Sequence, residues 1–308
     1  MKNIVRSAAI LATSVGFIFA SESSSNVTGL QMYSLQEDFD RDTPATLDHL
    51  KAQGFADIET SVFTKLPAEE LRGLVVARGM TCSSHHVRPE HLEKGIEKVI
   101  SDARALGAAQ VVCPILPHKG DLDREQVLKG AAAFNRYSSS LKAAGLKFGY
   151  HNHALDFMVA GSPGKPDETF YDILVGATDP EFVSFQLDVF WVAWGGATPT
   201  EVIALHGPRI CSLHLKDPAK EAIPDVRNPK SARSHMVRLA AGRVDIPGVI
   251  AAAKTKSVKH FIIEDESPNA AGQLAESLSL HAMAAPPVAG RFSVSDLRLP
   301  IRCRIPGG

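Results

Sequence analysis

The sequence predicts an α/β fold, a (β/α)₈ TIM barrel in a single domain. From residue 27 onward, short apolar runs alternate with longer helical patterns, and the alternation is completed eight times. Eight such pairs fill about 250 residues, the usual size of a (β/α)₈ barrel. A doubly wound sheet is the alternative, but no G-x-G-x-x-G motif follows the first strand, where a dinucleotide-binding fold places it.

The predicted strands are short runs rich in apolar and β-branched residues. In chain order they cover residues 27–35, 57–61, 81–87, 110–116, 147–153, 182–191, 210–217 and 259–266. The predicted helices between and after them cover residues 44–53, 67–78, 89–106, 124–144, 168–175, 199–205, 247–254 and 270–284. Several carry end signals: Thr43 is placed to cap the first helix, Pro89 opens the third, and Gly54 and Gly107 follow helix ends.

The two ends of the chain differ from the barrel segment, which we expect to span residues 27–285. Residues 1–20 combine a basic start (Lys2, Arg6) with a short apolar stretch, and a polar run follows. This pattern is typical of a secretory signal peptide and predicts export, to the periplasm in a bacterium. The alternative is a buried N-terminal helix, since the stretch is shorter than the ~20 residues of a membrane span. Residues 286–308, with prolines at the start and glycines at the end, are expected to form a poorly ordered extension.

Charge and cysteine content exclude several classes of protein. The chain has 33 Lys and Arg against 34 Asp and Glu, without a long basic run, so neither nucleic acid nor an anionic membrane is an expected partner. Past the first twenty residues, no window is long and apolar enough for a membrane helix. The four cysteines are widely spaced, which excludes C-x-x-C zinc or redox motifs and leaves buried free thiols or a structural disulfide. Nothing in the sequence indicates an oligomeric state.

Polar side chains gather at the predicted strand ends. In a (β/α)₈ barrel these ends and the loops after them form the mouth, where the chemistry takes place. The side chains there are Gln31 and Tyr33, Glu59, His85 and His86, His118, His151 to His153, Asp188, His214 with Lys216 and Asp217, and Glu264 to Glu266.

Three of these residues suit a metal ion. Asp188 lies in an otherwise apolar strand, where an uncompensated carboxylate costs several kcal/mol, so we expect a cation beside it. An ion pair with Lys216 is the alternative. His214 shares a strand face with Lys216, and Glu264 follows the last apolar run. Two carboxylates and an imidazole suit Mn²⁺, Co²⁺, Zn²⁺ or Fe²⁺.

The same segments resemble the xylose-isomerase-like barrel superfamily of sugar phosphate isomerases and epimerases. The resemblance covers about residues 27–280 and is carried by the runs GLQMYSL (29–35), SSH (83–85), GYHNH (149–153), FQLDVFW (185–191) with the following Gly195 and Gly196, HLKD (214–217) and FIIEDE (261–266). It implies one divalent metal ion held by four side chains. Asp188, His214 and Glu264 match three of them directly. Asp156 is the expected fourth, where relatives carry glutamate, with His151 or His153 as the alternatives.

The resemblance also implies an isomerase, an epimerase or a lyase that acts on a sugar or keto-sugar through an enediolate. Glu264 is the expected base, with His153 or His85 moving the second proton. Gln31, Tyr33, Lys216 and Trp191 are expected to bind substrate. Lys216 stands near the place where tagatose-type epimerases use arginine, and it lacks the bidentate geometry of arginine.

Two alternatives belong to other classes. A non-catalytic periplasmic sugar-binding barrel would use Tyr33, Trp191 and Trp194 as stacking surfaces. A DNA repair enzyme of the endonuclease IV type would need more metal ligands and a basic face, which the balanced charge disfavours. The expected ligand is therefore a small sugar.

Overall fold

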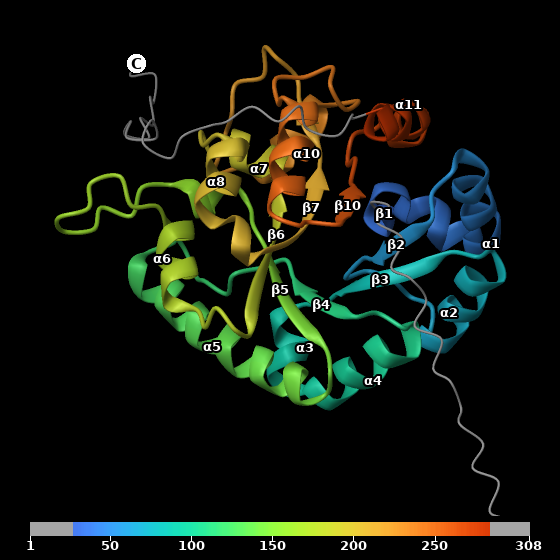
Figure 1. Ribbon diagram of the computed structural model, residues 1–308, viewed down its shortest axis with the longest axis horizontal. Helices are drawn as coiled ribbons and strands as arrows, with labels where there is room; N and C mark the ends of the chain where they lie inside the picture. Colours follow the sequence, from blue (N-terminus) through green and yellow to red (C-terminus); the bar gives the residue numbers. More distant parts are fainter. Residues whose placement is uncertain (1–26, 284–308) are drawn as a thin grey trace, which may run out of the picture.

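The computed structural model describes residues 27–283, and eight parallel strands close into a barrel within this part of the chain. Helices surround the central strands (Figure 1). The barrel strands are β1 (Val27–Gln31), β2 (Asp57–Thr60), β3 (Thr81–His86), β4 (Gln110–Cys113), β5 (Lys147–His151), β6 (Val183–Asp188), β7 (Ile210–Leu215) and β10 (His260–Ile263). Each barrel strand pairs in parallel with the next barrel strand along the chain, and β10 closes the barrel against β1. The predicted fold class is confirmed.

The helices follow the strands around the barrel. They are α1 (Gln36–Gln53), α2 (Ala68–Ala77), α3 (Pro89–Lys94), α4 (Ile96–Leu106), α5 (Arg124–Ala143), α6 (Phe170–Ala177), α7 (Val189–Trp194), α8 (Pro199–His206), α9 (Pro229–Ala232), α10 (Ile246–Thr255) and α11 (Ala270–Met283). Short 3₁₀ helices are η1 (Met32–Leu35), η2 (Ala154–Phe157), η3 (Gly207–Arg209) and η4 (Arg233–His235), and β8 (Asp217–Pro218) pairs antiparallel with β9 (Met236–Val237). None of the described helices has the length and apolar character needed to cross a membrane.

Two helices differ from the prediction. The first helix begins at Gln36, and its backbone kinks at Asp42 (φ −156°). The Asp42 side chain accepts a hydrogen bond from the Ala45 amide at 2.9 Å, whereas Thr43 donates to the carbonyl of Phe39. Asp42 therefore caps the second part of α1, the role predicted for Thr43. Likewise, the predicted helix 89–106 is divided at Gly95 into α3 and α4.

The sixth strand is shorter than predicted because a helix begins directly after it. The Asp188 carboxylate accepts a hydrogen bond from the Trp191 amide at 3.0 Å, which caps α7 and ends β6. The apolar residues after Asp188 thus form a buried helix, which in sequence cannot be distinguished from a continued strand.

Alternation along the strands separates the core from the barrel interior. In β7, Leu213 and Leu215 belong to the apolar core, whereas His214 contacts Glu59 across the barrel. The described cysteines, Cys82, Cys113 and Cys211, are free thiols. Cys303, the predicted signal peptide 1–20 and the predicted extension 286–308 lie outside the described residues.

Candidate active site

Four buried side chains from neighbouring strands meet at the carboxyl end of the barrel. His151 ends β5, Asp188 ends β6, His214 lies in β7 and Glu264 follows β10. One ligand atom from each lies within 4.8 Å of the others, so the group can hold a metal ion. The parallel register that pairs Asp188 with His214 explains the convergence, because strand ends at one height point into the same mouth.

Asp188 retains an oxygen without a hydrogen bond. Its Oδ1 caps α7, while Oδ2 lies 3.1 Å from Lys216 Nζ. The ion pair weighed as an alternative is therefore present, yet no donor is aligned with this buried oxygen. Burial raises the pKa of Asp188, and Lys216 only partly offsets it. A buried carboxylate oxygen that accepts no hydrogen bond can coordinate a cation.

His214 is held between two carboxylates. Its Nε2 lies 2.6 Å from Glu59 Oε1, and its Nδ1 lies 2.8 Å from Glu264 Oε2. Burial disfavours the imidazolium, but the two carboxylates outweigh burial and raise the pKa of His214 to about 10. A metal ion bound here takes the place of a proton, since imidazole coordinates in its neutral form.

His151, and not Asp156, is the fourth member of the group. Burial lowers the pKa of His151 well below its usual value, so the imidazole is neutral, and its Nε2 faces Asp188 Oδ2 at 3.7 Å. The Asp156 carboxylate instead accepts hydrogen bonds from Tyr150 Oη at 2.9 Å and from the His153 amide at 2.8 Å. Asp156, the fourth ligand expected from the sequence, therefore lies outside this group: it caps η2, and burial raises its pKa to about 7.

Lys216 is almost fully buried among acids. Its Nζ lies 2.5 Å from Glu264 Oε2 and 2.9 Å from Glu266 Oε1, in addition to the contact with Asp188. Burial disfavours the ammonium, but these carboxylates keep the pKa of Lys216 well above its usual value. Lys216 and His214 in turn hold the pKa of Glu264 well below its usual value against the effect of burial, so Glu264 is ionised.

A second layer of the site centres on Glu59, to which the sequence analysis assigned no role. We call Glu59 and the polar side chains bonded to it the Glu59 cluster; the others are Gln31 (2.8 Å), Ser84, His86 (2.8 Å), Gln186 (2.6 Å) and His214 (2.6 Å). Glu59 is fully buried, and His86 and His214 outweigh burial to hold its pKa well below the usual value. The signal in the sequence was the position of Glu59 at the end of a predicted strand.

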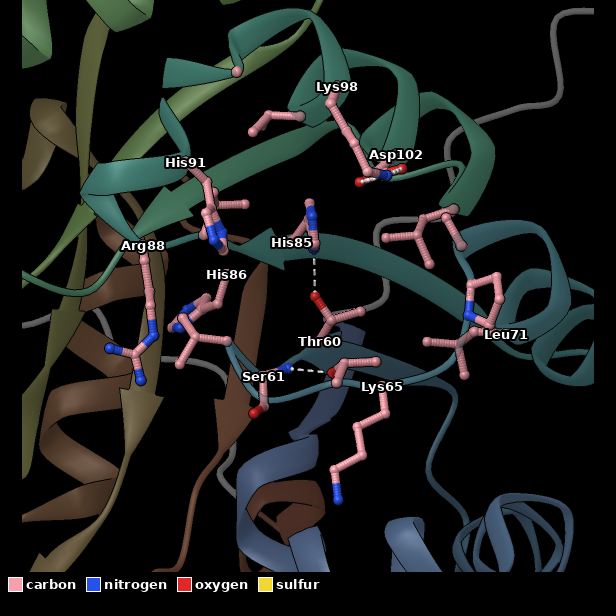
Figure 2. A pocket seen from close by; sticks show the side chains of 18 of the residues that line it. Thr60, Ser61, Lys65, Leu71, His85, His86, Arg88, His91, Lys98 and Asp102 are labelled. Carbon is pink, nitrogen blue, oxygen red and sulfur yellow. Dashed lines mark hydrogen bonds and ion pairs between the residues drawn. The ribbon is translucent and has the colours of Figure 1, made fainter. Parts of the chain in front are cut away.

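The two adjacent histidines of β3 face opposite sides of the barrel wall. His86 belongs to the Glu59 cluster, and its ring stacks on that of His214 with centroids 5.6 Å apart. His85 points outward, with Nδ1 2.7 Å from Thr60 Oγ1 (Figure 2). Burial lowers the pKa of His85 to about 4. His85 thus lies outside the barrel interior, and proton transfer by His85 does not fit this placement.

The mouth above the group is a cavity of about 220 Å³. Five of the predicted site residues line this cavity: Gln31, Tyr33, His153, Lys216 and Glu264. Burial lowers the pKa of His153 to about 3, so its imidazole is neutral.

The two tryptophans lie behind this lining. Trp191 is buried and contacts the rings and cations that face the cavity, with its ring 5.3 Å from that of His153 and 5.6 Å from Lys216 Nζ. Trp194 is buried against Phe190. Neither offers the open stacking surface that a non-catalytic sugar-binding barrel would need.

The donors fit a borderline divalent ion. Two carboxylates and two imidazoles form an O,N set, one oxygen lacks a donor, and burial keeps His151 neutral. Zn²⁺, Mn²⁺, Co²⁺ and Fe²⁺ all suit such ligands.

Fold and site together define a (β/α)₈ barrel with a buried group of possible metal ligands at its mouth. Residues 47–282 match the model of the xylose isomerase-like TIM barrel family, and the chain belongs to this family. Among solved structures, it is similar to a sugar phosphate isomerase/epimerase from Parabacteroides distasonis, with 24% identity, a TM-score of 0.70, and coverage of 86% of this chain and 96% of the other.

Two further proteins are similar to this chain. An inosose dehydratase of Clostridium botulinum is 27% identical over 150 residues, which cover 49% of this chain and 47% of the relative, so the match spans about half the length of that protein. A structure of "IOLI protein with a binding zinc atom" shares the fold, with 15% identity, a TM-score of 0.65, and coverage of 84% and 96%. The comparisons thus establish the family and the fold.

Proposed function

We propose that the chain is a metal-dependent enzyme that removes the proton next to the carbonyl of a keto-sugar or inosose, giving isomerisation, epimerisation or dehydration. The observation that carries the proposal is the buried group of His151, Asp188, His214 and Glu264 below a polar mouth. A divalent ion in that group would polarise the substrate carbonyl and stabilise the negative charge that develops on its oxygen.

Glu264 is the proposed base. It lines the mouth and is ionised, so it can accept the proton from the carbon next to the carbonyl. Lys216 keeps its charge beside Glu264 and can stabilise the negative oxygens of the enediolate.

His153 is the proposed second proton carrier. Its neutral imidazole lines the mouth next to His151, with ring centroids 5.1 Å apart. Delivery of a proton to the former carbonyl carbon gives isomerisation. Its return to the opposite face of the carbon that lost it gives epimerisation. If a hydroxyl leaves from the next carbon instead, a proton delivered to that oxygen releases water, which is dehydration.

Solvent deuterium exchange tests the proposal before the product is known. Metal-loaded protein is incubated in D₂O with free ketoses, keto-glycosides and inososes, and deuterium next to the carbonyl is followed by NMR. We expect incorporation into at least one substrate, its loss after chelation, and a rate reduced by ~10²–10⁴-fold in Glu264→Gln. Turnover without solvent deuterium, together with a primary isotope effect for internal hydrogen movement, would instead establish a hydride shift.

We also propose that the protein is exported and cleaved near residue 20, on the basis of the basic, apolar and polar order of its first residues. N-terminal sequencing of protein recovered from the periplasm should start near Ser21. An intact N-terminus in a cytoplasmic fraction would contradict export.

A further inference from the structure

A second cavity adjoins the mouth on the outer side of the barrel wall. It has a volume of about 820 Å³ and lies between the ends of β2 and β3 and the helices α2, α3 and α4 (Figure 2). Four of its lining residues, Ser61, Val62, His86 and Arg88, also line the mouth. A substrate bound in the mouth can therefore reach Arg88, where the two cavities meet.

The charge of Arg88 is unmatched within the described chain. Among residues 27–283, its guanidinium makes neither a hydrogen bond nor an ion pair, and it lies over the Phe63 ring, 4.9 Å from Cζ to the centroid. The other basic side chains of the mouth have acidic partners. Lys216 contacts three carboxylates, and Arg233 lies 3.2 Å from Glu266 Oε2.

The surroundings hold Arg88 at the rim. It is the residue before Pro89, which opens α3, and it is only partly exposed. The Phe63 ring stacks on Tyr33 with centroids 5.5 Å apart, and Arg233 Cζ lies 5.3 Å from the centroid of the Tyr33 ring. A contact with an aromatic ring satisfies none of the guanidinium N–H donors in a hydrogen bond, so these donors are available to a ligand.

We propose that Arg88 binds an oxyanion, a carboxylate or a phosphate, carried by the substrate at the end away from its reacting carbonyl. The fork of N–H donors matches two oxygens of either group, and the partly buried, unpaired cation lacks only such a partner. This inference rests on the proposed function for the sugar part of the substrate and adds the acidic substituent as its determinant of specificity.

Calorimetric titration of the full, metal-loaded chain tests whether Arg88 binds an oxyanion, and the test does not require turnover. The probes are D-glucose, D-glucuronate and D-glucose 6-phosphate, which differ at one carbon, so the last two distinguish carboxylate from phosphate. For wild type we expect at least one charged probe to bind about tenfold or more tightly than glucose. Arg88→Gln should abolish this preference, Arg88→Lys should keep part of it, and Arg41→Gln, at an exposed arginine paired with Asp38, should leave it unchanged.

The proposal is overturned if wild type binds neither charged probe more tightly than glucose, or if Arg88→Gln keeps the preference. Failure of the proposed function is separate, because an anion preference without deuterium exchange contradicts only the chemistry. Exchange of neutral ketoses without an anion preference contradicts only the role of Arg88.

Discussion

Glu59 shows how a single buried charge is stabilised by its neighbours. The carboxylate accepts hydrogen bonds from two amides and a hydroxyl and faces two imidazoles, so its desolvation is compensated from five directions. Through the contact with Nε2, Glu59 also fixes the ring of His214, which leaves Nδ1 facing Glu264.

Replacing this carboxylate should be costly. Glu59→Ala leaves several buried donors unpaired and should lower the free energy of unfolding by about 3–5 kcal/mol. Urea denaturation measures the change, with Glu70→Ala on the exposed side of α2 as a control expected to change it by about 1 kcal/mol or less. Equal effects of the two substitutions would show that the Glu59 cluster does not stabilise the barrel.

At the scale of elements, the site depends on how α7 packs against η2, since α7 follows Asp188 and η2 follows His153. Gly195, directly after α7, allows this contact. A Cβ there would lie 2.7 Å from the Ala154 carbonyl oxygen and 2.8 Å from Phe157 Cβ, and neither a backbone oxygen nor a Cβ bonded to the backbone can easily move.

Gly195→Ala should therefore destabilise the chain by about 1–3 kcal/mol, through overpacking. Gly176→Ala is the matched control, because a Cβ at this helical position meets nothing within 4 Å, and it should be neutral or stabilising by up to about 1 kcal/mol. Thermal and urea unfolding measure both. A Gly195→Ala protein as stable as wild type would mean that α7 and η2 separate without cost.

The order of the elements was predictable, and so were three of the four clustered residues. Strand alternation determines which face holds His214, and Asp188 and Glu264 follow from adjacent strand ends. The sequence-based expectations for Asp156 and His85 differ from the structure because the positions of these side chains depend on single contacts. The hydrogen bonds of Asp156 to Tyr150 and His153 are invisible in sequence, and alternation alone does not tell which of His85 and His86 faces inward, because the register between β2 and β3 shifts after Ile58.

For the whole molecule, protons and metal ions compete at His214, which predicts a dependence of stability on pH. In the metal-free chain the pKa of His214 is raised to about 10, above the ~6.5 of an unfolded histidine. The contribution of protonated His214 to the free energy of unfolding is thus fully present below about pH 6.5 and is lost as the pH rises toward 10. The metal-free chain should lose a few kcal/mol of unfolding free energy between pH 7 and pH 10.

Urea denaturation of chelator-treated and of metal-loaded protein between pH 7 and pH 10 measures the effect. The loaded protein should lack this loss, because its His214 has no such proton to release. His214→Gln should lack it as well. The same decline in all three samples would assign it to other groups.

The most direct test of the buried metal centre is elemental analysis of the purified chain after dialysis against Zn²⁺ or Mn²⁺. We predict about one ion per chain in wild type and in Asp156→Asn, and much lower occupancy in His214→Ala and His151→Ala. Full occupancy in His214→Ala, or loss of metal in Asp156→Asn with retention in His151→Ala, would contradict the site as drawn from His151, Asp188, His214 and Glu264.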